Sequence, residues 1–574
     1  MFLKCSERKA NGKTYKYYNV VESTRIGGKV KHNILFPLGT LSDEKAERIR
    51  NILKIGGALD NSGRKLYRLS DIIITKTLDF LNIYILHRLW CDWKLDSFFQ
   101  NYRYIEKLVI NRCISPMSKY RTSEWEDGEL IDKLNNQSTP EPFGAYDELD
   151  RIADSENEIQ NHLCSLLKEQ NMLDNQTIIY DITSTFFERT RCTLAFRGYS
   201  RDHRPDKLQI VIAMAINSQG YPFYWKVYNG NTPDVTTVED FTDQIIRLIG
   251  ATDFLFVFDR GMVSHDNIAY IEEKKYRFIS AIDRNEISTS TPVDVEQFGG
   301  VDNQNYLERL SNFSKFDEHL CYHEYQSNGH RYIIGFDLKK QLDERQSRKN
   351  RLERFDRGVC DLNQNLSEAK RDRSKDAVVK SVESLIKKAH LKKAIQVVIN
   401  NISVPRGKKF VQSFSITYEV DQNALYEAGL TDGLTCFYTN TSPDDFSAAA
   451  VIRQYRDKNA VEEGFHEIKG VIELRPIFLS LEKRVRAHVT ICILAYLLYN
   501  SLEKRVSAKL QLSASDILIE LAKCKSTSIT VESGEENHRV LTRFTQTQLA
   551  ILDYLCYSPK SIQRDFKMFA ASAN

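Results

Sequence analysis

Two short apolar runs, each ending in an aspartate, constrain this chain more than any other feature. The first run extends from Thr177 to Asp181 and the second from Phe254 to Asp259. Both runs are rich in β-branched and aromatic residues, which is typical of buried strands. Because each run closes on an acid, we expect two carboxylates at the ends of two core strands.

A third carboxylate stands in a segment with helical spacing. At about 100° per residue, one helical face would carry four polar residues: Tyr455, Lys458, Glu462 and Lys469. An apolar stripe would lie beside them, formed by Val461, Phe465 and Ile468. Ser442 followed by Pro443 is typical of a helix start, so we expect one helix from there through Lys469.

The region around the two aspartates has a regular order of predicted elements. After the run that ends at Asp181, two more strands are expected at residues 208–216 and 221–227, joined by a turn, so that three consecutive strands pair antiparallel. A helix at 237–248, the Asp259 run, a helix at 267–275 and a strand at 278–282 follow. The predicted order is therefore strand, strand, strand, helix, strand, helix, strand.

These motifs together resemble a known protein family. The spacing Tyr455-x2-Lys458-x3-Glu462-x6-Lys469 matches the Tyr-x2-Arg-x3-Glu-x6-Lys signature of the DDE transposases of the IS4 group, with Lys458 where the pattern usually has Arg. Four further stretches are similar to the bacterial IS1634-type branch of that group: residues 180–184, 198–206, 258–262 and 486–488. The resemblance covers roughly residues 175 to 500.

The resemblance implies a fold and an activity. The fold would be α/β, with a ribonuclease-H-like catalytic core interrupted by a β-rich insertion and preceded by an α+β region. The activity would be that of an insertion-sequence transposase, which binds terminal inverted repeats, hydrolyses the DNA at the element ends and joins the 3′-hydroxyls to target DNA. The partners would be double-stranded DNA and a second copy of the chain, as a homodimer in the DNA complex.

The chemistry of the acids fits that activity. Asp181, Asp259 and Glu462 would hold two Mg²⁺ ions, with Mn²⁺ able to substitute, because hard cations prefer carboxylate oxygens and two such ions catalyse in-line displacement at phosphorus. Several other acids compete for this role: Glu188, Asp234, Glu239, Asp240, Glu463 and Glu467. Glu462 is preferred over Glu463 because only Glu462 has the signature offsets from Tyr455 and Lys469.

The resemblance also assigns DNA-binding residues. In the family the signature Tyr, basic residue and Lys contact phosphates near the cleaved end, which gives that role to Tyr455, Lys458 and Lys469. Lys458 lacks the bidentate fork of an arginine. A basic cluster before the second strand, formed by Arg197, Arg201 and Arg204, is expected either to add DNA contacts or to be an ordinary solvated loop.

The chain divides into six predicted regions. The long separation of Asp259 from Glu462 requires a folded insertion, and its segment 338–393 carries 17 Lys and Arg against nine Asp and Glu. The predicted regions are 1–65, small, basic and β-rich; 66–170, helical and binding DNA ends; 171–283, the first part of the core; 284–440, the insertion; 441–505, the second part of the core; and 506–574, C-terminal and helical.

Bulk composition is compatible with this interpretation without establishing it. The net charge of +3 is nearly balanced, so DNA binding would depend on local patches. Eleven scattered cysteines without zinc spacing indicate reduced thiols. No apolar signal segment or membrane span is expected, because the long apolar stretch at 487–502 is read as a core helix. We therefore expect a bacterial cytoplasmic protein that joins the nucleoid when bound to DNA.

Two other functions are compatible with the same residues. One is a metal-dependent nuclease or recombinase that has this core but does not transpose. The other is a DNA-binding regulator with an inactive core, against which the three intact acids argue.

Overall fold

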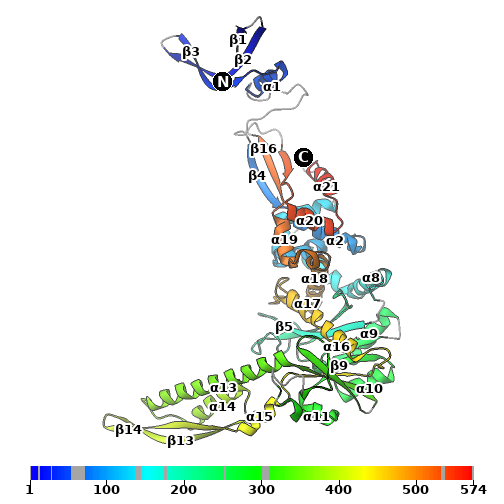
Figure 1. Cartoon of the computed structure of the whole chain (residues 1–574), viewed down its shortest axis with the longest axis vertical. Coiled ribbons are helices and arrows are strands. Elements are labelled where there is room, and N and C mark those ends of the chain that lie inside the picture. The colour runs from blue at the N-terminus through cyan, green and yellow to red at the C-terminus, as the bar shows by residue number, and fades with distance from the viewer. Residues whose placement is uncertain are drawn as a thin grey trace. The chain divides into compact units, whose positions relative to one another are not determined.

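The computed structural model describes residues 2–10, 13–26, 29–53, 72–135, 144–173, 177–250, 254–299, 301, 309–327, 329–531 and 537–571. The chain splits into two compact units, Met1–Glu148 with Leu494–Asn574, and Leu149–Ile493 (Figure 1). Gly27-Gly28, which suggest a hairpin in the N-terminal region, and the Pro-containing segment 138–142, which is typical of a loop, lie outside the described residues.

The N-terminal region is a small sheet with one helix against it. Strands β1 (Phe2–Ala10), β2 (Lys13–Ile26) and β3 (Lys29–Gly39) pair antiparallel in that order, and α1 (Asp43–Leu53) follows. Tyr18 and Val20 of β2 are buried in one cluster with Ala46 of α1. The β-rich character predicted for the first residues is therefore present.

A second sheet in the same unit corrects the sequence prediction. Residues 72–79 were expected to begin a helix, but they form the strand β4 (Ile72–Asp79), which pairs with β16 (Lys525–Val531), itself paired with β17 (Asn537–Leu541). Three consecutive isoleucines favour a strand, and the partner strand stands some 450 residues later in the sequence. The C-terminal region was predicted to be helical, but it also contributes the strands β16 and β17 to this sheet.

Helices make up the rest of this unit and lead into the next. They are α2 (Leu81–Asp92), α3 (Leu95–Phe98), α4 (Ile105–Ile114), α5 (Lys119–Ser123), α6 (Glu129–Leu134), α7 (Gly144–Asp154), α18 (Glu482–Leu510), α19 (Ala514–Ala522), α20 (Gln546–Tyr554) and α21 (Pro559–Ala571). Among the described helices, α18 alone is long and apolar enough to cross a membrane, but 94% of its apolar window is buried inside the protein. It is a core helix, as predicted, and His488 on it is buried, with ring nitrogens beside the Leu474 carbonyl and Cys492 Sγ.

The second unit is built on one mixed sheet. Among the described residues its strand order is β10-β11-β12-β15-β9-β8-β5-β6-β7. Strands β5 (Thr177–Phe186), β6 (Gln209–Ile216) and β7 (Pro222–Asn229) pair antiparallel, as predicted, whereas β8 (Leu255–Val257) runs parallel to β5 and β9 (Arg277–Ile282) parallel to β8. Helices α8 (Glu156–Glu169), α9 (Val238–Ile249) and α10 (His265–Glu273) accompany these strands.

The first aspartate does not end its strand. The apolar run was expected to stop at Asp181, but β5 continues to Phe186 and pairs with β6 along that whole length, from Ile179 opposite Ile216 to Phe186 opposite Gln209. The residues after Asp181 include two threonines, which are compatible with a strand. Asp181 is therefore held by strand pairing on both sides of its position.

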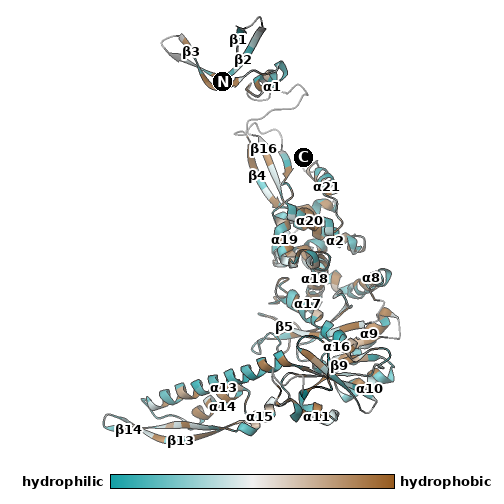
Figure 2. Ribbon diagram, viewed as in Figure 1, coloured by the Kyte–Doolittle hydropathy of each residue, from teal (hydrophilic) through white to brown (hydrophobic). Residues whose placement is uncertain are grey.

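Part of the predicted insertion continues the same sheet. Strands β10 (Ser314–Lys315), β11 (Leu320–Ser327), β12 (His330–Asp337) and β15 (Leu434–Thr439) extend it antiparallel beyond β9, after the short helix α11 (Ile287–Ser290). The rest forms a lobe with its own buried core, made by α13 (Leu338–Ser367), α14 (Lys375–Ala389), β13 (Ile395–Arg406) and β14 (Lys409–Val420), followed by α15 (Gln422–Gly429). Figure 2 shows α13 as hydrophilic over most of its length, as its charge-rich sequence predicts.

The signature segment forms two abutting helices rather than one. The predicted start at Ser442 is a turn, and α16 (Ala448–Asp457) begins after Ser447, whose hydroxyl accepts a hydrogen bond from the Ala450 N–H at 3.2 Å. α17 (Asn459–Lys469) follows after Lys458, where the Lys458 carbonyl accepts from Val461 N at 3.0 Å. This shorter hydrogen-bonded turn interrupts the regular α-helical pattern at Lys458.

Candidate functional site

Asp181 lies on β5, and Asp259 follows the end of the neighbouring parallel strand β8. In the pairing of β5 with β8, Ile179 stands opposite Val257. Asp181 and Asp259 each follow these residues by two positions, so the same register places them side by side. Asp259 leaves the sheet at the end of β8 and is followed by the 3₁₀-helix η4 (Arg260–Met262).

The third acid comes from the first turn of α17. This helix packs against β5 and β6 through the predicted apolar stripe, in which Val461, Phe465 and Ile468 are all buried. The stripe fixes the rotation of the helix, and Glu462 on its other face points toward the aspartates. A carboxylate in the first turn is also favoured by the positive end of the helix dipole.

One ammonium group sits among the three acids. Lys458 Nζ lies 3.6 Å from Asp259 Oδ1 and forms a hydrogen-bonded ion pair with Glu462 Oε1. The Lys458 side chain is only 5% exposed, whereas those of Asp259 and Glu462 are 43% and 54% exposed. The structure thus brings Lys458 into the acid cluster itself.

Electrostatics in the cluster reflect an excess of negative charge. The pKa of Asp181 is raised to about 7, mainly by burial and to a smaller extent by the charges of Asp259 and Glu462, while Lys458 opposes the rise. For Lys458, burial works against the charged form, but the acids outweigh it, and the pKa of the ammonium is raised. The cluster therefore contains three acids and only one cation, Lys458.

The donor set suits a divalent metal ion, although its atoms are not yet arranged around one. Within the part of the chain that the structure describes, no three acidic, histidine or cysteine side chains are close enough to hold one ion as they stand. At this site, Lys458 binds Asp259 and Glu462 directly. The residue types, all hard oxygen donors around a cation, nevertheless match what Mg²⁺ requires.

Tyr455 joins this cluster as predicted from the shared helical face. Its phenol donates to Asp259 Oδ1 at 3.3 Å, and the Lys458 ammonium lies 5.8 Å from its ring centre. Burial, reinforced by Asp259, raises the pKa of Tyr455 well above its usual range. The phenol therefore stays protonated and can hold one oxygen of Asp259 in place.

Lys469 goes to a different cluster. Its ammonium binds Asp202 Oδ1 at 2.8 Å, and Arg475 pairs with the same oxygen. The Asp202 side chain is 3% exposed and that of Lys469 10%. Burial lowers the pKa of Lys469, Asp202 opposes this shift, and the positive charges of Arg475 and Arg201 add to it.

The predicted arginine cluster is divided by internal pairing. Arg201 pairs with Asp234, and Arg204 pairs with Asp206 through two hydrogen bonds of 2.9 and 2.8 Å. Arg197 is exposed and makes no hydrogen bond or ion pair with other residues in the described part of the chain.

Three of the six competing acids pair with residues outside the cluster. Glu188 pairs with Lys207, Asp234 with Arg201, and Asp240 with Lys226 and Tyr228. Glu463, next to Glu462 on α17, is exposed, and no contact joins it to the aspartates. The geometry therefore favours Glu462, in agreement with the prediction from spacing.

Two residues of interest were not singled out from the sequence. Asp202 lies in the 198–206 stretch that resembles the family, and this stretch was interpreted through its basic residues. Sequence reasoning therefore missed that Lys469 and Arg475 share Asp202. Arg260 immediately follows Asp259, and that adjacency was the available signal. Its side chain is exposed and lines a cavity together with Asp259, Tyr455 and Glu462.

Two protein-family models match the sequence of this chain. The sequence model of the transposase DDE domain matches residues 174–498, more than half of the chain, and that of the IS1634 family transposase N-terminal domain matches residues 3–59. A search of curated proteins returned no match. A solved structure described as a "piggyBac transposase synaptic complex with hairpin DNA" is similar at 10% identity and a TM-score of 0.34, over 78% of this chain and 82% of that one.

The matched domain contains all three clustered acids, and the matched N-terminal domain coincides with the β1–β3 sheet and α1. Members of the DDE family are enzymes that cleave DNA and transfer strands, and they generally use divalent metal ions. The chain belongs to the DDE transposases, of the IS1634 type.

Proposed function

We propose that this chain cuts DNA at the terminal inverted repeats of an insertion sequence and joins the 3′-hydroxyl ends to target DNA by two-metal catalysis. One observation carries the proposal: Asp259, just after β8, and Glu462 of α17 both bind Lys458, and Asp181 on the neighbouring strand β5 feels the charges of all three. Acids delivered in this way from two strands and a helix suit a pair of Mg²⁺ ions, with Mn²⁺ as a substitute.

The strand arrangement supports a ribonuclease-H-like core. The order β7-β6-β5-β8-β9, with β6 antiparallel to both neighbours and β5, β8 and β9 parallel, is the one expected for that fold. In our proposal residues 171–283 and 441–505 make up this core and residues 284–440 are its insertion. Residues 1–65 and 66–170 would recognise the element ends, and 506–574 would complete the end-binding part.

Each acid of the cluster would have its own part in holding the metal. Asp181, fixed by its pairing with β6, would hold the ions together with Asp259 and Glu462. When bound, the ions would activate the attacking water or 3′-hydroxyl and stabilise the leaving oxygen. Tyr455 keeps Asp259 oriented by donating to one of its oxygens.

Lys458 would serve as the positive charge of the cluster until metal binds. Its ammonium holds Asp259 and Glu462 together, which limits their mutual repulsion. Once divalent ions neutralise the acids, the ammonium would move to a phosphate beside the scissile bond, which is the DNA contact assigned to it by the family signature. Tyr455, whose ring lies near the Lys458 ammonium, would contact the same phosphate.

For the remaining cations we propose DNA contacts that differ according to whether an acid of the protein already pairs with the cation. Arg197, exposed and unpaired by any described residue, would contact DNA phosphates directly. Arg201, Arg204 and Lys469 would reach DNA only by sharing their charge with Asp234, Asp206 and Asp202. DNA ends would be held by two copies of the chain, as a homodimer on DNA in the bacterial nucleoid.

The experiment uses the DNA that flanks the gene. Full-length protein, Mg²⁺ and labelled duplexes carrying the flanking sequences should give cuts at the ends of imperfect inverted repeats and joining of those ends to a plasmid. Asp259→Asn should bind the same duplex and leave it uncut.

Cleavage without any joining would instead support a nuclease of the same fold. Equal cutting of duplexes with scrambled ends would contradict recognition of terminal repeats.

A further inference from the structure

A cavity of about 720 Å³ opens beside the acid cluster. Asp259, Tyr455, Lys458 and Glu462 line one part of it, and Arg260, Arg284 and Lys340 line another. These three cations come from different elements: Arg260 from the turn after β8, Arg284 from the 3₁₀-helix η5 (Arg284–Glu286) after β9, and Lys340 from the first turn of α13. Asp337 and Glu344 line the same part, so the wall opposite the acid cluster holds three cations and two acids.

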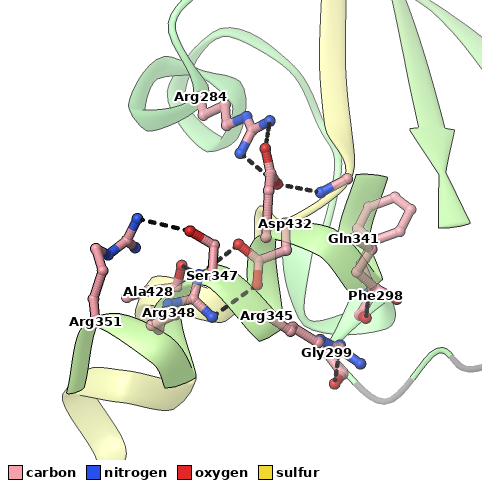
Figure 3. Close-up of polar contacts among 12 residues, drawn as sticks. Arg284, Phe298, Gly299, Gln341, Arg345, Ser347, Arg348, Arg351, Ala428 and Asp432 are labelled. Atoms are coloured by element: carbon pink, nitrogen blue, oxygen red, sulfur yellow. Dashed lines mark hydrogen bonds and ion pairs between the residues drawn. The ribbon is translucent and has the colours of Figure 1, made fainter. Parts of the chain in front are cut away.

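Several charges in the cavity wall are already neutralised. Arg284 donates two hydrogen bonds of 2.9 and 2.8 Å to Glu344, and Glu344 also accepts from Gly433 N (Figure 3). Arg456 pairs with Asp317, and Lys458 pairs with the catalytic acids. Only Arg260 and Lys340 among these cations have no acid partner in the described part of the chain.

Arg260 and Lys340 are close enough to affect each other. Lys340 Nζ donates to the Thr435 hydroxyl at 3.0 Å, a neutral partner. Burial and then the charge of Arg284 lower the pKa of Lys340, Glu344 and Asp337 oppose this shift, and the charge of Arg260 adds a smaller lowering. Arg260 and Lys340 line one cavity and neither side chain pairs with an acid among the described residues, so an anion bound by both would remove the repulsion between them.

We propose that Arg260 and Lys340 form a phosphate subsite for a nucleic-acid phosphodiester that neighbours the one held at Asp181, Asp259 and Glu462. This inference rests on the proposed function. Arg260 would supply a planar fork that can bind two phosphate oxygens, and Lys340 a point charge fixed by Thr435. Neither residue belongs to the signature from which DNA contacts were predicted.

The subsite would set how the strand enters the catalytic cluster. Arg260 is the residue directly after Asp259, so a phosphate bound by its guanidinium is tied to the position of a metal ligand. A second contact on α13 would fix the direction in which the backbone leaves that ligand. Arg260 and Lys340 are accordingly positioning residues, and their removal should affect binding of the strand more than binding of the metal.

The test combines substitutions with neutralised phosphates. Duplexes carrying one terminal repeat are made with a single methylphosphonate, in turn at each phosphate within a few nucleotides of the cleaved bond, and their affinities for full-length wild type, Arg260→Ala and Lys340→Met are measured. Lys339→Ala is the matched control, because Lys339 is the exposed neighbour of Lys340 in the same turn. Methionine at 340 keeps the apolar stem of the lysine.

At one position, neutralising the phosphate should weaken wild-type binding by about tenfold, the size expected for a charge-assisted hydrogen bond. Arg260→Ala and Lys340→Met should bind unmodified DNA about tenfold less tightly than wild type. When the phosphate at that same position is neutralised, the affinity of each variant should fall by less than a further twofold. Lys339→Ala should behave as wild type. Losses that simply add at every position, or equal effects of Lys339→Ala and Lys340→Met, would overturn the subsite.

A metal titration separates this proposal from an effect on the acids. Arg260→Ala should bind Mn²⁺ as wild type does, and a reduced Mn²⁺ affinity would show that the substitution acts through Asp259, which would overturn the subsite. Wild-type protein that neither binds nor cuts the flanking repeats would refute the proposed function itself. Wild type that cuts them without coupling at any phosphate would refute the subsite alone.

Discussion

The two lysines at the ends of α17 occupy opposite electrical environments. Lys458 lies among three acids, and the pKa of its ammonium is raised. Lys469 shares one acid with Arg475, and the pKa of its ammonium is lowered, first by burial. Both lysines belong to one sequence signature, yet only the first stands where cations are scarce.

The difference teaches what each cluster can accept. The cluster around Lys458 has more acids than cations and opens into a cavity, so it can take up divalent ions. The cluster around Asp202 has more cations than acids, and the Asp202 side chain is only 3% exposed. Its main role is therefore structural, because it joins α17 to the 198–206 stretch and to Arg475. One Asp202 oxygen has no hydrogen-bond partner among the described residues, which leaves both cations bound to the other oxygen.

The largest expected effect comes from removing a charge in the acid-rich cluster. Glu462→Gln should lower Mg²⁺-dependent cleavage by about a thousandfold or more, because a metal ion supplies several kcal/mol of transition-state stabilisation and each 1.4 kcal/mol is about tenfold. End binding should stay within a few fold. Asp181→Asn and Asp259→Asn should behave alike in gel-shift and cleavage assays on one duplex.

Glu463→Gln is the matched control for that prediction. The residue neighbours Glu462 on the same helix but is exposed and outside the cluster, so its substitution should leave cleavage nearly normal. A dead Glu463→Gln beside an active Glu462→Gln would show that the register of α17 is wrong.

Removing the acid of the cluster around Asp202 should lower the stability of the protein rather than impair catalysis. Asp202→Asn leaves Lys469 and Arg475 near each other without their shared acid. Breaking a buried pair costs about 3–5 kcal/mol, and Arg475 is 34% exposed, so we expect a loss of about 2–3 kcal/mol in the free energy of unfolding, measured by urea denaturation. Asp206→Asn, which breaks the exposed pair with Arg204, should leave the free energy of unfolding nearly unchanged. Equal losses in the two variants would contradict the structural role of Asp202.

A smaller effect should distinguish the two lysines by metal affinity. Lys458→Met removes the ammonium that binds Asp259 and Glu462, so Mn²⁺ should bind about tenfold more tightly, since two charges about 4 Å apart interact by roughly 1–4 kcal/mol near a protein surface. Lys469→Met should leave Mn²⁺ affinity unchanged. Free Mn²⁺ measured by electron paramagnetic resonance gives both affinities. The account is contradicted if both substitutions raise the affinity, or if neither does.

The smallest effect concerns the arginines near the second strand. Arg197→Ala should reduce the slope of log K against log salt for end binding by about 0.9, the contribution of one neutralised phosphate. Arg204→Ala should change the slope less, because Asp206 already neutralises Arg204. The affinities are measured between low and moderate salt on the same duplex, and a larger change for Arg204→Ala would reverse the assignment.

The sequence predicted the acids because their signals are local. Asp181 and Asp259 follow apolar runs, and Glu462 lies at fixed offsets from Tyr455, so strand and helix periodicity sufficed. The same spacing also predicted that Tyr455 and Lys458 join the cluster. Spacing could not show that Lys469, seven residues beyond Glu462, is about 10 Å further along the helix axis and meets Asp202 instead.

Other features depended on partners remote in sequence. The run at Ile72 was expected to be helical, and its strand partner β16 lies near the other end of the chain. Residues 318–337 and 394–439 alternate as strands do, but nothing local showed that β11, β12 and β15 extend the sheet of β5 and β9. The helix start moved from Ser442 to Ser447 because both serines can cap a turn, and only tertiary packing decides between them.

The central claim is that the acids around Lys458 form the metal site. A crystal of the full-length protein soaked in Mn²⁺ tests it most directly through anomalous difference density. We predict peaks bound by oxygens of Asp181, Asp259 and Glu462, with the Lys458 ammonium moved away from Asp259. Strong peaks elsewhere, with Lys458 still bound to Asp259 and Glu462 at saturating Mn²⁺, would contradict the claim.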